Sequence, residues 1–393
     1  MDVIWLLANV WVITFVLFIT IYFGYFLLVF ALAKIKGNKP KKADNFTPSI
    51  SILIPCYNVG SVIDYKIKNT LEIDYPNDKF EIIAVESGST DDTYLKLSKY
   101  AEDVKVKLIR QPKRLGKSSA INKGLEECRE EIIVLTDADA KVEKNAIREL
   151  VRNFADPKVG AAVADVIIVS GETIASRMNQ IFYDYFRRKP RIWESELDSV
   201  SFCSGHLLAF YKKVVGKIDE DVINDDRYIL LKTRSKGYRC VCEPLSHVCE
   251  ADTGEFSSQI MQKRRTTAGA IQGTIRFKNL QFNPKYGFFG TIILPFSFLR
   301  VVFLPFLLFV LEILSPIVIW TLLSSNWFFW TITIITILLV CLSNSIRKIF
   351  LSLSYGIIIQ IAVFIGIMDY VFKRYSPLWT RVGGPWDEIA WKT

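Results

Sequence analysis

The chain has 393 residues, of which 51% are hydrophobic, and a formal net charge of +9. The apolar residues gather in residues 3–33 and roughly 288–372, which excludes a chain that is water-soluble throughout. The lysines crowd beside these apolar regions, where they would meet anionic lipid headgroups, so we expect no nucleic-acid partner. An odd number of cysteines, seven, without a CxxC pair argues against a disulfide framework and against structural zinc.

The first apolar region, residues 1–33, predicts an N-terminal transmembrane helix. It exceeds the roughly 20 residues that cross a bilayer and the ~7–15 of a signal peptide, and nothing basic precedes it. A basic linker, residues 34–47, follows with the sequence KIKGNKPKK. Because basic flanks remain in the cytoplasm, we expect the amino terminus outside the cell and the domain that follows in the cytoplasm.

Residues 48–275 predict an α/β domain. Short, apolar, β-branched runs indicate strands at 49–54, 80–86, 104–110 and 131–137, with helical patterns between the first three and before the fourth. This alternation is typical of βαβ units and a mostly parallel sheet. The first, second and fourth runs end in the polar clusters PCYN, ESGSTDD and TDADA. Because ligands bind outside the carboxyl ends of parallel strands, we expect these clusters to share one crevice.

Two clusters in this domain carry residues suited to phosphate chemistry. Asp137 and Asp139 of TDADA are separated by one residue where a strand ends, so both can bind one hard cation that also contacts phosphate. The pattern alone is weak, since aspartate is common in turns. Lys117 lies near a helix start marked by Ser118 or Ser119, where free amides and the helix dipole favour an anion.

In this order and spacing, the motifs resemble those of a family-two glycosyltransferase. SILIPCYN, VESGSTDDT, GKSSAINKGL and VLTDADA resemble the nucleotide-sugar half of that family, which has the Rossmann-like GT-A fold. Four later segments resemble hyaluronan, chitin and cellulose-type polysaccharide synthases. They are the acceptor segment CSGHLLAFYKK (203–213), the base segment NDDRYILLKTRSKGY (224–238), QKRRTTAG (262–269) for Gln-x-x-Arg-Trp, and LWTRVGG (378–384) for Trp-Gly-Thr-Arg.

The resemblance implies a role for each matching residue. Asp226 is the implied general base, and Asp139 and Asp137 are the implied ligands of Mg²⁺ or Mn²⁺. The residues implied for the donor nucleotide and diphosphate are Pro55, Tyr57, Glu86, Lys117, Asp137, Gln262, Arg264, Arg265, Trp379 and Arg381. The residues implied for the acceptor are Cys203, Ser204, Gly205 and Asp225. One base opposite the leaving group implies a single displacement with inversion.

The chain departs from the family pattern at the acceptor site. Thr266 stands where the family has a tryptophan whose ring stacks on the acceptor sugar, and threonine has no aromatic face. Tyr183, Tyr185 and Trp193 either replace that ring or pack in the protein interior. His206, in the acceptor segment, either contacts a substrate or packs.

The carboxyl-terminal third predicts further membrane segments. Residues 276–295 mix basic, aromatic and apolar residues, as an interfacial amphipathic helix does. Residues 296–372 predict three or four transmembrane helices, in which Arg300 and Glu312 are expected to snorkel or to face other helices. The tail, residues 373–393, carries the WTR motif and is expected in the cytoplasm because of its basic flank.

Three functions are compatible with the sequence. The first is a multi-pass cell-membrane synthase that processively transfers sugar from a UDP-sugar to a growing β-linked polysaccharide and extrudes the polymer. The second transfers one sugar from a UDP-sugar to a membrane lipid, such as a polyprenyl phosphate or ceramide. The third is a catalytically silent scaffold that binds a nucleotide-sugar. The expected partners are the UDP-sugar, a carbohydrate polymer or lipid acceptor, and membrane lipids.

Overall fold

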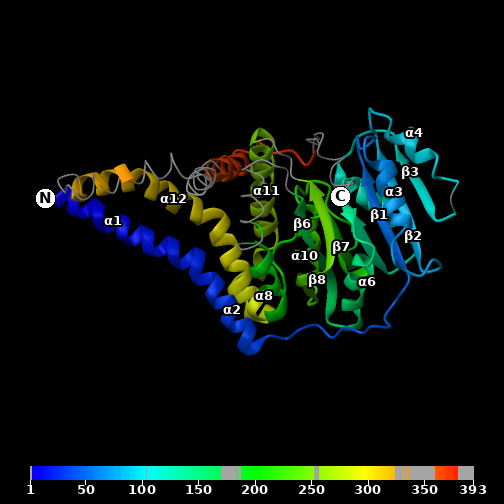
Figure 1. Cartoon of the computed structure of the whole chain (residues 1–393), viewed down its shortest axis with the longest axis horizontal. Coiled ribbons are helices and arrows are strands. Elements are labelled where there is room, and N and C mark those ends of the chain that lie inside the picture. Colours follow the sequence, from blue (N-terminus) through cyan, green and yellow to red (C-terminus); the bar gives the residue numbers. More distant parts are fainter. Residues whose placement is uncertain are drawn as a thin grey trace.

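The computed structural model describes residues 2–102, 104–169, 187–251, 256–323 and 359–378, together with Tyr183, Thr331, Ile334 and Ile335. An α/β domain occupies one end of the molecule, and two long helical stretches, from opposite ends of the domain's sequence, extend away from it (Figure 1). Most of the candidate site residues lie in the α/β domain.

The described residues of this domain form an eight-stranded sheet in the order β3-β2-β1-β4-β7-β6-β8-β5. The strands are β1 (Ile50–Cys56), β2 (Phe80–Ser87), β3 (Val106–Gln111), β4 (Ile132–Thr136), β5 (Lys141–Val142), β6 (Val159–Val169), β7 (Leu207–Tyr211) and β8 (Arg239–Ala251). The four expected strands are confirmed as β1 to β4, and they pair in parallel. β6 is also parallel to β8, whereas β7 runs antiparallel to both β4 and β6.

Helices cover both faces of the sheet, which explains why its central strands are continuous apolar runs. Ile52 of β1 belongs to the hydrophobic core on one face, with Ile67, while Leu53 belongs to the core on the other, with Ile121. The helices of the domain are α3 (Ile63–Leu71), α4 (Thr93–Ser98), α5 (Lys117–Glu127), α6 (Ala146–Val151), α8 (Lys189–Leu197), α9 (Lys212–Val215), α10 (Asp225–Ser235) and α11 (Phe256–Arg276).

The antiparallel direction of β7 determines which segments meet at the functional edge. Thr136, the last residue of β4, is paired with Leu207, the first residue of β7. Residues 203–206 therefore reach the same edge of the sheet as the TDADA loop. β6 and β8 run opposite to β7, so their carboxyl ends lie at this edge too.

Among the described residues, two helical stretches are long and apolar enough to cross a membrane, by length and composition. The first, Val3–Lys36, runs through α1 (Asp2–Ile19), the π-turn η1 (Thr20–Gly24) and α2 (Tyr25–Lys36); the second, Phe289–Thr321, lies mainly in α12 (Leu294–Leu323). They pack side by side (Figure 1). The Trp11 indole donates a hydrogen bond to Ser315 Oγ over 2.8 Å, and the Tyr25 and Phe296 rings stack at 5.3 Å.

The prediction of a single amphipathic helix over residues 276–295 is wrong, because the chain forms several short turns there. After α11 the chain forms two 3-10 turns, η4 (Lys278–Leu280) and η5 (Pro284–Tyr286), and then the π-turn η6 (Phe289–Ile293) that opens α12. Pro284 lacks a backbone donor and Gly287 has φ of 56°, so a continuous helix is interrupted here. The number of crossings after α12 stays a prediction, since most of residues 324–358 lie outside the described part.

A buried ion pair connects the α/β domain to the start of the second membrane stretch. Arg234 of α10 lies 3.0 Å from Asp198, and each side chain is only 10% exposed. Asp198 also accepts a hydrogen bond from the backbone N–H of Phe289 over 3.0 Å, while Arg234 donates one to the carbonyl of Tyr286. The domain and the beginning of α12 are thereby held in one arrangement.

Replacing Asp198 by asparagine tests this connection. The substitution removes the charge that compensates buried Arg234, and breaking a buried pair costs about 3–5 kcal/mol. We therefore expect Asp198→Asn to lower the free energy of unfolding of the detergent-solubilised chain by that order. Asp74→Asn is the control, because the Asp74–Arg148 pair is exposed. Equal unfolding transitions of the two variants would contradict the role given to Asp198.

Candidate active site

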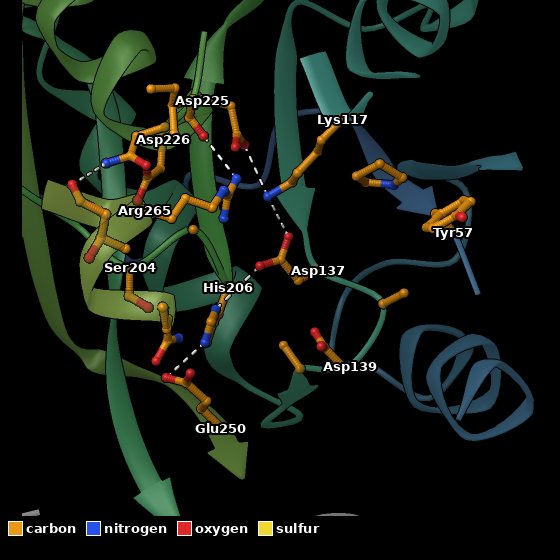
Figure 2. Close-up of a pocket in the computed structure, with 18 of the residues that line it drawn as sticks. Tyr57, Lys117, Asp137, Asp139, Ser204, His206, Asp225, Asp226, Glu250 and Arg265 are labelled. Atoms are coloured by element: carbon orange, nitrogen blue, oxygen red, sulfur yellow. Dashed lines mark hydrogen bonds and ion pairs between the residues drawn. The ribbon is translucent and has the colours of Figure 1, made fainter. Parts of the chain in front are cut away.

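A cavity of about 330 Å³ lies at the edge where β4 and β7 meet. Most residues implied by the family resemblance line it (Figure 2). The lining residues that were predicted to bind the donor are Pro55, Tyr57, Lys117, Asp137, Gln262 and Arg265. Those predicted to bind the acceptor are Cys203, Ser204, Gly205 and Asp225. The predicted metal ligand Asp139 and the predicted base Asp226 also line the cavity. Residues from distant parts of the chain are thus brought together.

Lys117 lies between two acidic pairs that line the cavity, Asp137 with Asp139 and Asp225 with Asp226. Its ammonium lies 2.7 Å from Asp137 Oδ1 and 3.0 Å from Asp225 Oδ2, as Figure 2 shows. Burial lowers the pKa of Lys117, but the two carboxylates outweigh burial and raise the pKa above its ordinary value. Lys117 is also the first residue of α5, after Gly116 with φ of 96°, so the helix begins before Ser118. A cation at a helix amino terminus is suited to a phosphate.

Asp226 is the acid with the clearest properties of a base. It lies in the first turn of α10, and its Oδ1 accepts a hydrogen bond from the N–H of Arg227 over 2.7 Å. Burial and the neighbouring Asp225 carboxylate raise the pKa of Asp226 to about 6. Gly205 keeps the space in front of it open, since a Cβ there would lie 3.5 Å from Asp226 Cβ and 3.6 Å from Lys117 Nζ.

A buried lysine that was not predicted from the sequence, Lys66, donates hydrogen bonds to the TDADA loop. Lys66 of α3 is fully buried, and its ammonium donates to Thr136 Oγ1 and to the carbonyl of Ala140, both at 2.7 Å. These partners flank Asp137 and Asp139, so Lys66 fixes both ends of the loop. Burial lowers the pKa of Lys66 to about 7.

A histidine and a second carboxylate extend the acidic side of the cavity. His206 lies between Asp137 and Glu250 (Figure 2), with Nδ1 3.3 Å from Asp137 Oδ2 and Nε2 2.8 Å from Glu250 Oε2. Burial lowers the pKa of His206, but Glu250 and Asp137 outweigh it and raise the pKa. Burial likewise raises the pKa of Glu250. His206 therefore lines the cavity and has polar partners on both sides.

The donor set suits a divalent cation shared with a substrate. Asp137 and Asp139 supply carboxylate oxygens, which Mg²⁺ and Mn²⁺ prefer. Within the described residues no three His, Cys, Asp or Glu side chains form a ready-made metal site. The remaining ligands would then come from phosphate and water, which is the usual situation for Mg²⁺ in phosphate-transfer sites.

Two predicted donor residues lie elsewhere. Glu86 is fully buried, accepts a hydrogen bond from the N–H of Ser89 and faces Arg110 at 3.6 Å, outside the cavity lining. Arg264 pairs with Asp369 over 2.9 Å. Gln262, Lys263, Arg265 and Thr266 of α11 line the cavity, whereas Arg264 does not.

The last described segment approaches the cavity beside the start of α5. Helix Ile359–Val371 carries Asp369, the partner of Arg264 on α11. Further on, a Cβ at Gly116 would lie 3.4 Å from Leu378 Cδ2, so Leu378 lies beside the residue that precedes Lys117. Trp379 and Arg381, which follow directly, lie outside the described residues.

Of the aromatic residues considered as replacements for the missing tryptophan, one lines the cavity and another packs elsewhere. Thr266 lines the cavity, and its hydroxyl donates to the carbonyl of Lys263 over 3.2 Å. Tyr183 also lines the cavity. Trp193 instead packs against Phe30 of α2, with ring centroids 5.0 Å apart. Tyr185 lies outside the described residues.

Of the residues missed from sequence, Lys66 carried a readable signal. It falls in the stripe Ile63, Lys66, Ile67, Thr70, which has the spacing of a buried helix face, and all four are buried. Glu250 had no such signal, since its position depends on the long-range pairing of β8 with β6.

Comparison with known proteins agrees with this geometry. Residues 51–219 match the sequence profile of Glycosyl transferase family 2. The chain is 29% identical over 201 residues to poly-beta-1,6-N-acetyl-D-glucosamine synthase of Staphylococcus aureus (strain COL), covering 50% of this chain and 48% of the relative. It is 26% identical over 251 residues to the probable glycosyltransferase YdaM of Bacillus subtilis (strain 168), covering 61% and 60%. The chain thus spans about half the length of the first of these relatives.

Among solved structures, the mannosyltransferase PcManGT from Pyrobaculum calidifontis, in complex with GDP-Man and Mn2+, has a similar fold. The TM-score is 0.69 at 23% identity, over 92% of this chain and 98% of that one. The α/β domain therefore has the GT-A fold. The stretch that matches Glycosyl transferase family 2, residues 51–219, lies within this domain.

The contact between His206 and Asp137 generates a prediction about metal affinity. Outer-shell partners orient a ligating carboxylate, and losing one typically weakens metal binding about 10–100-fold. We expect His206→Gln to weaken Mn²⁺ binding in this range, measured by titration of the free Mn²⁺ electron paramagnetic resonance signal with UDP present. His247→Gln is a matched control, because that histidine pairs with Glu143 and does not line the cavity. Unchanged affinity in His206→Gln would exclude this orienting role.

Proposed function

We propose that this chain transfers a sugar from a nucleoside diphosphate sugar to an acceptor hydroxyl at a membrane, with inversion at the sugar carbon. One observation carries the proposal. The acids suited to a metal and diphosphate, Asp137 and Asp139, share a cavity with the acids suited to proton abstraction, Asp225 and Asp226, and Lys117 lies between the two groups.

In this reaction Asp226 accepts the proton of the acceptor hydroxyl while the hydroxyl oxygen bonds to the sugar carbon. The bond from that carbon to the diphosphate oxygen breaks, and the electron pair leaves with the nucleoside diphosphate. Lys117 and Arg265 offset the negative charge that develops on the leaving oxygens. A bound Mg²⁺ or Mn²⁺ would add Lewis-acid stabilisation of the same charge. The raised pKa of Asp226 suits a base.

The donor proposed is a UDP-sugar. Tyr57 lines the cavity, and the Arg114 guanidinium lies over its ring, 4.3 Å from the centroid. This pair offers a flat, positively charged surface for a nucleotide. Release of nucleoside diphosphate across a panel of UDP- and GDP-sugars, with and without Mn²⁺, tests the base and the sugar together.

Two acceptor classes follow from different observations. Similarity to a poly-beta-1,6-N-acetyl-D-glucosamine synthase favours a growing polysaccharide that the chain extrudes. Thr266, which offers no aromatic floor in the cavity, favours addition of one sugar to a membrane lipid. Product analysis with a labelled donor separates them: a ladder of long products excludes the lipid acceptor, and a single sugar on an extractable lipid excludes the polymer.

Asparagine at position 226 tests the proposed base. Asp226→Asn keeps the size of the side chain but cannot take a proton, so we expect kcat to fall about 10²–10⁴-fold, the usual contribution of general base catalysis. Binding of Mn²⁺ and UDP should persist, as measured by calorimetry. Asp219→Asn is the control, since Asp219 pairs with Arg276 away from the cavity. Turnover at the wild-type rate in Asp226→Asn removes the assignment.

The raised pKa of Asp226 predicts a pH dependence. Below about pH 6 the carboxyl is protonated and cannot act as a base, so kcat/KM should rise tenfold per pH unit up to about 6 and then level off. The Asp225 carboxylate contributes to the raised pKa of Asp226. Asp225→Asn should therefore move the rising part of the kcat/KM profile, its acid limb, to lower pH. Initial rates between about pH 4.5 and 8 measure both effects. A limb at the same pH in both proteins contradicts the assignment to Asp226.

A further inference from the structure

Helix α11 contacts different parts of the chain with two of its faces. Gln262 and Arg265, three residues apart, line the cavity. Arg264 and Thr267, also three apart, face helix Ile359–Val371, which is red in Figure 1. α11 therefore lies between the cavity and this last described helix, and contacts on both sides set its position.

The contact with helix Ile359–Val371 is close and directional. The Arg264 guanidinium donates two hydrogen bonds to the Asp369 carboxylate, from Nε to Oδ2 over 3.0 Å and from Nη2 to Oδ1 over 3.2 Å. Three residues before Asp369, a Cβ at Gly366 would lie 2.6 Å from the Arg264 carbonyl oxygen and 2.9 Å from Thr267 Cβ. A two-point arginine–carboxylate pair beside so close a backbone approach fixes how α11 is rotated against this helix.

On the cavity side, α11 holds the segment that leads into α10. Arg265 Nη2 donates to the carbonyl of Ile223 over 2.8 Å, and Asn224 Nδ2 donates to the carbonyl of Thr266 over 3.1 Å. Asn224 directly precedes the first turn of α10, which carries the proposed base Asp226. The proposed base is thus two contacts away from the backbone of α11.

Two residues further along α11 strengthen this attachment. A Cβ at Gly269 would lie 2.4 Å from Asn224 Cγ, so only glycine lets the asparagine amide pack against the helix. Gln272 accepts a hydrogen bond from the Ile223 N–H over 3.0 Å and donates one to the carbonyl of Asp221 over 2.9 Å. A displacement of α11 would therefore move the start of α10 with it.

Arg265 also lies within electrostatic reach of the acids at the start of α10. Burial lowers the pKa of Arg265, while the Asp225 and Asp226 carboxylates act to raise it. The same guanidinium is assigned to the leaving diphosphate in the proposed reaction. The position of α11 therefore affects the stabilisation of the leaving group and the placement of the base together.

We propose that Asp369 is a positioning residue, which acts through Arg264 and α11 to hold Arg265 and the start of α10 in the arrangement that transfer requires. The Arg264 side chain is 40% exposed, and such pairs contribute little to the free energy of unfolding. Loss of the pair should therefore disturb the cavity and leave the chain folded. This inference rests on the proposed transferase function and adds to it a residue that does not line the cavity.

Turnover and UDP binding of two single variants and their double variant test the inference. Arg264→Gln and Asp369→Asn should each lower kcat/KM about 10–100-fold, since small displacements caused far from the reacting atoms have effects of this size. Each should also weaken UDP binding about tenfold in calorimetry with Mn²⁺ present, because Arg265 moves. If Asp369 acts through Arg264, the double variant loses no more than either single variant. Effects of the two substitutions that multiply overturn the inference.

Reversal of the two charges provides a rescue. Arg264→Glu combined with Asp369→Arg rebuilds an ion pair, so the combination should recover most of the turnover that Arg264→Glu alone loses. Arg148→Gln is the matched control, because Arg148 is 38% exposed, pairs with Asp74 over 2.9 Å and does not line the cavity. We expect wild-type turnover in this control. Wild-type turnover in Arg264→Gln, or no recovery on charge reversal, excludes the positioning role.

The wild-type chain separates this inference from the proposed function. If it transfers sugar from none of the nucleoside diphosphate sugars, the transferase proposal fails, while UDP binding by the variants still reports whether Asp369 places Arg265. If it transfers sugar and both single variants do so at the wild-type rate, only the role of Asp369 fails.

Discussion

The cavity depends on one cation placed between acids that would otherwise repel one another. Asp137 and Asp225 come from separate elements, the end of β4 and the start of α10, and both face the same partly dry space. The ammonium of Lys117 contacts both carboxylates, so charges of like sign can remain close without solvent between them. The TDADA loop and the start of α10 are adjacent across the cavity, and this cation links them.

The fold supplies the arrangement that such a contact requires. An antiparallel strand, β7, follows β4 in the sheet, so the chain entering β7 passes directly beside the TDADA loop. The carbonyl of His206 accepts hydrogen bonds from the Thr136 hydroxyl and the Asp137 N–H, and the Lys66 ammonium donates to Thr136 Oγ1 and the Ala140 carbonyl of the same loop. Rigid support of this kind fixes reacting groups better than mobile loops do.

The sequence allowed the parallel half of the sheet and the acidic loop to be predicted, because strands buried on both faces leave unbroken apolar runs. It did not reveal the direction of β7, since that depends on pairing between residues far apart in the chain. Glu86 and Arg264 were assigned to the donor by motif position. Side chains of neighbouring residues point to opposite faces of a sheet in a strand and about 100° apart in a helix. The position of a residue within a motif therefore does not determine where its side chain points.

The contact between Leu378 and Gly116 has a consequence for biosynthesis. Ribosomes make the amino-terminal residues first, and domains generally fold as units in that order. The strands and the acidic loop are complete long before helix Ile359–Val371 leaves the ribosome. Until Leu378, which follows that helix, is placed beside Gly116, the start of α5 lacks its neighbour from the carboxyl-terminal segment. The surroundings of the start of α5 are therefore completed only after every residue that lines the cavity has been made.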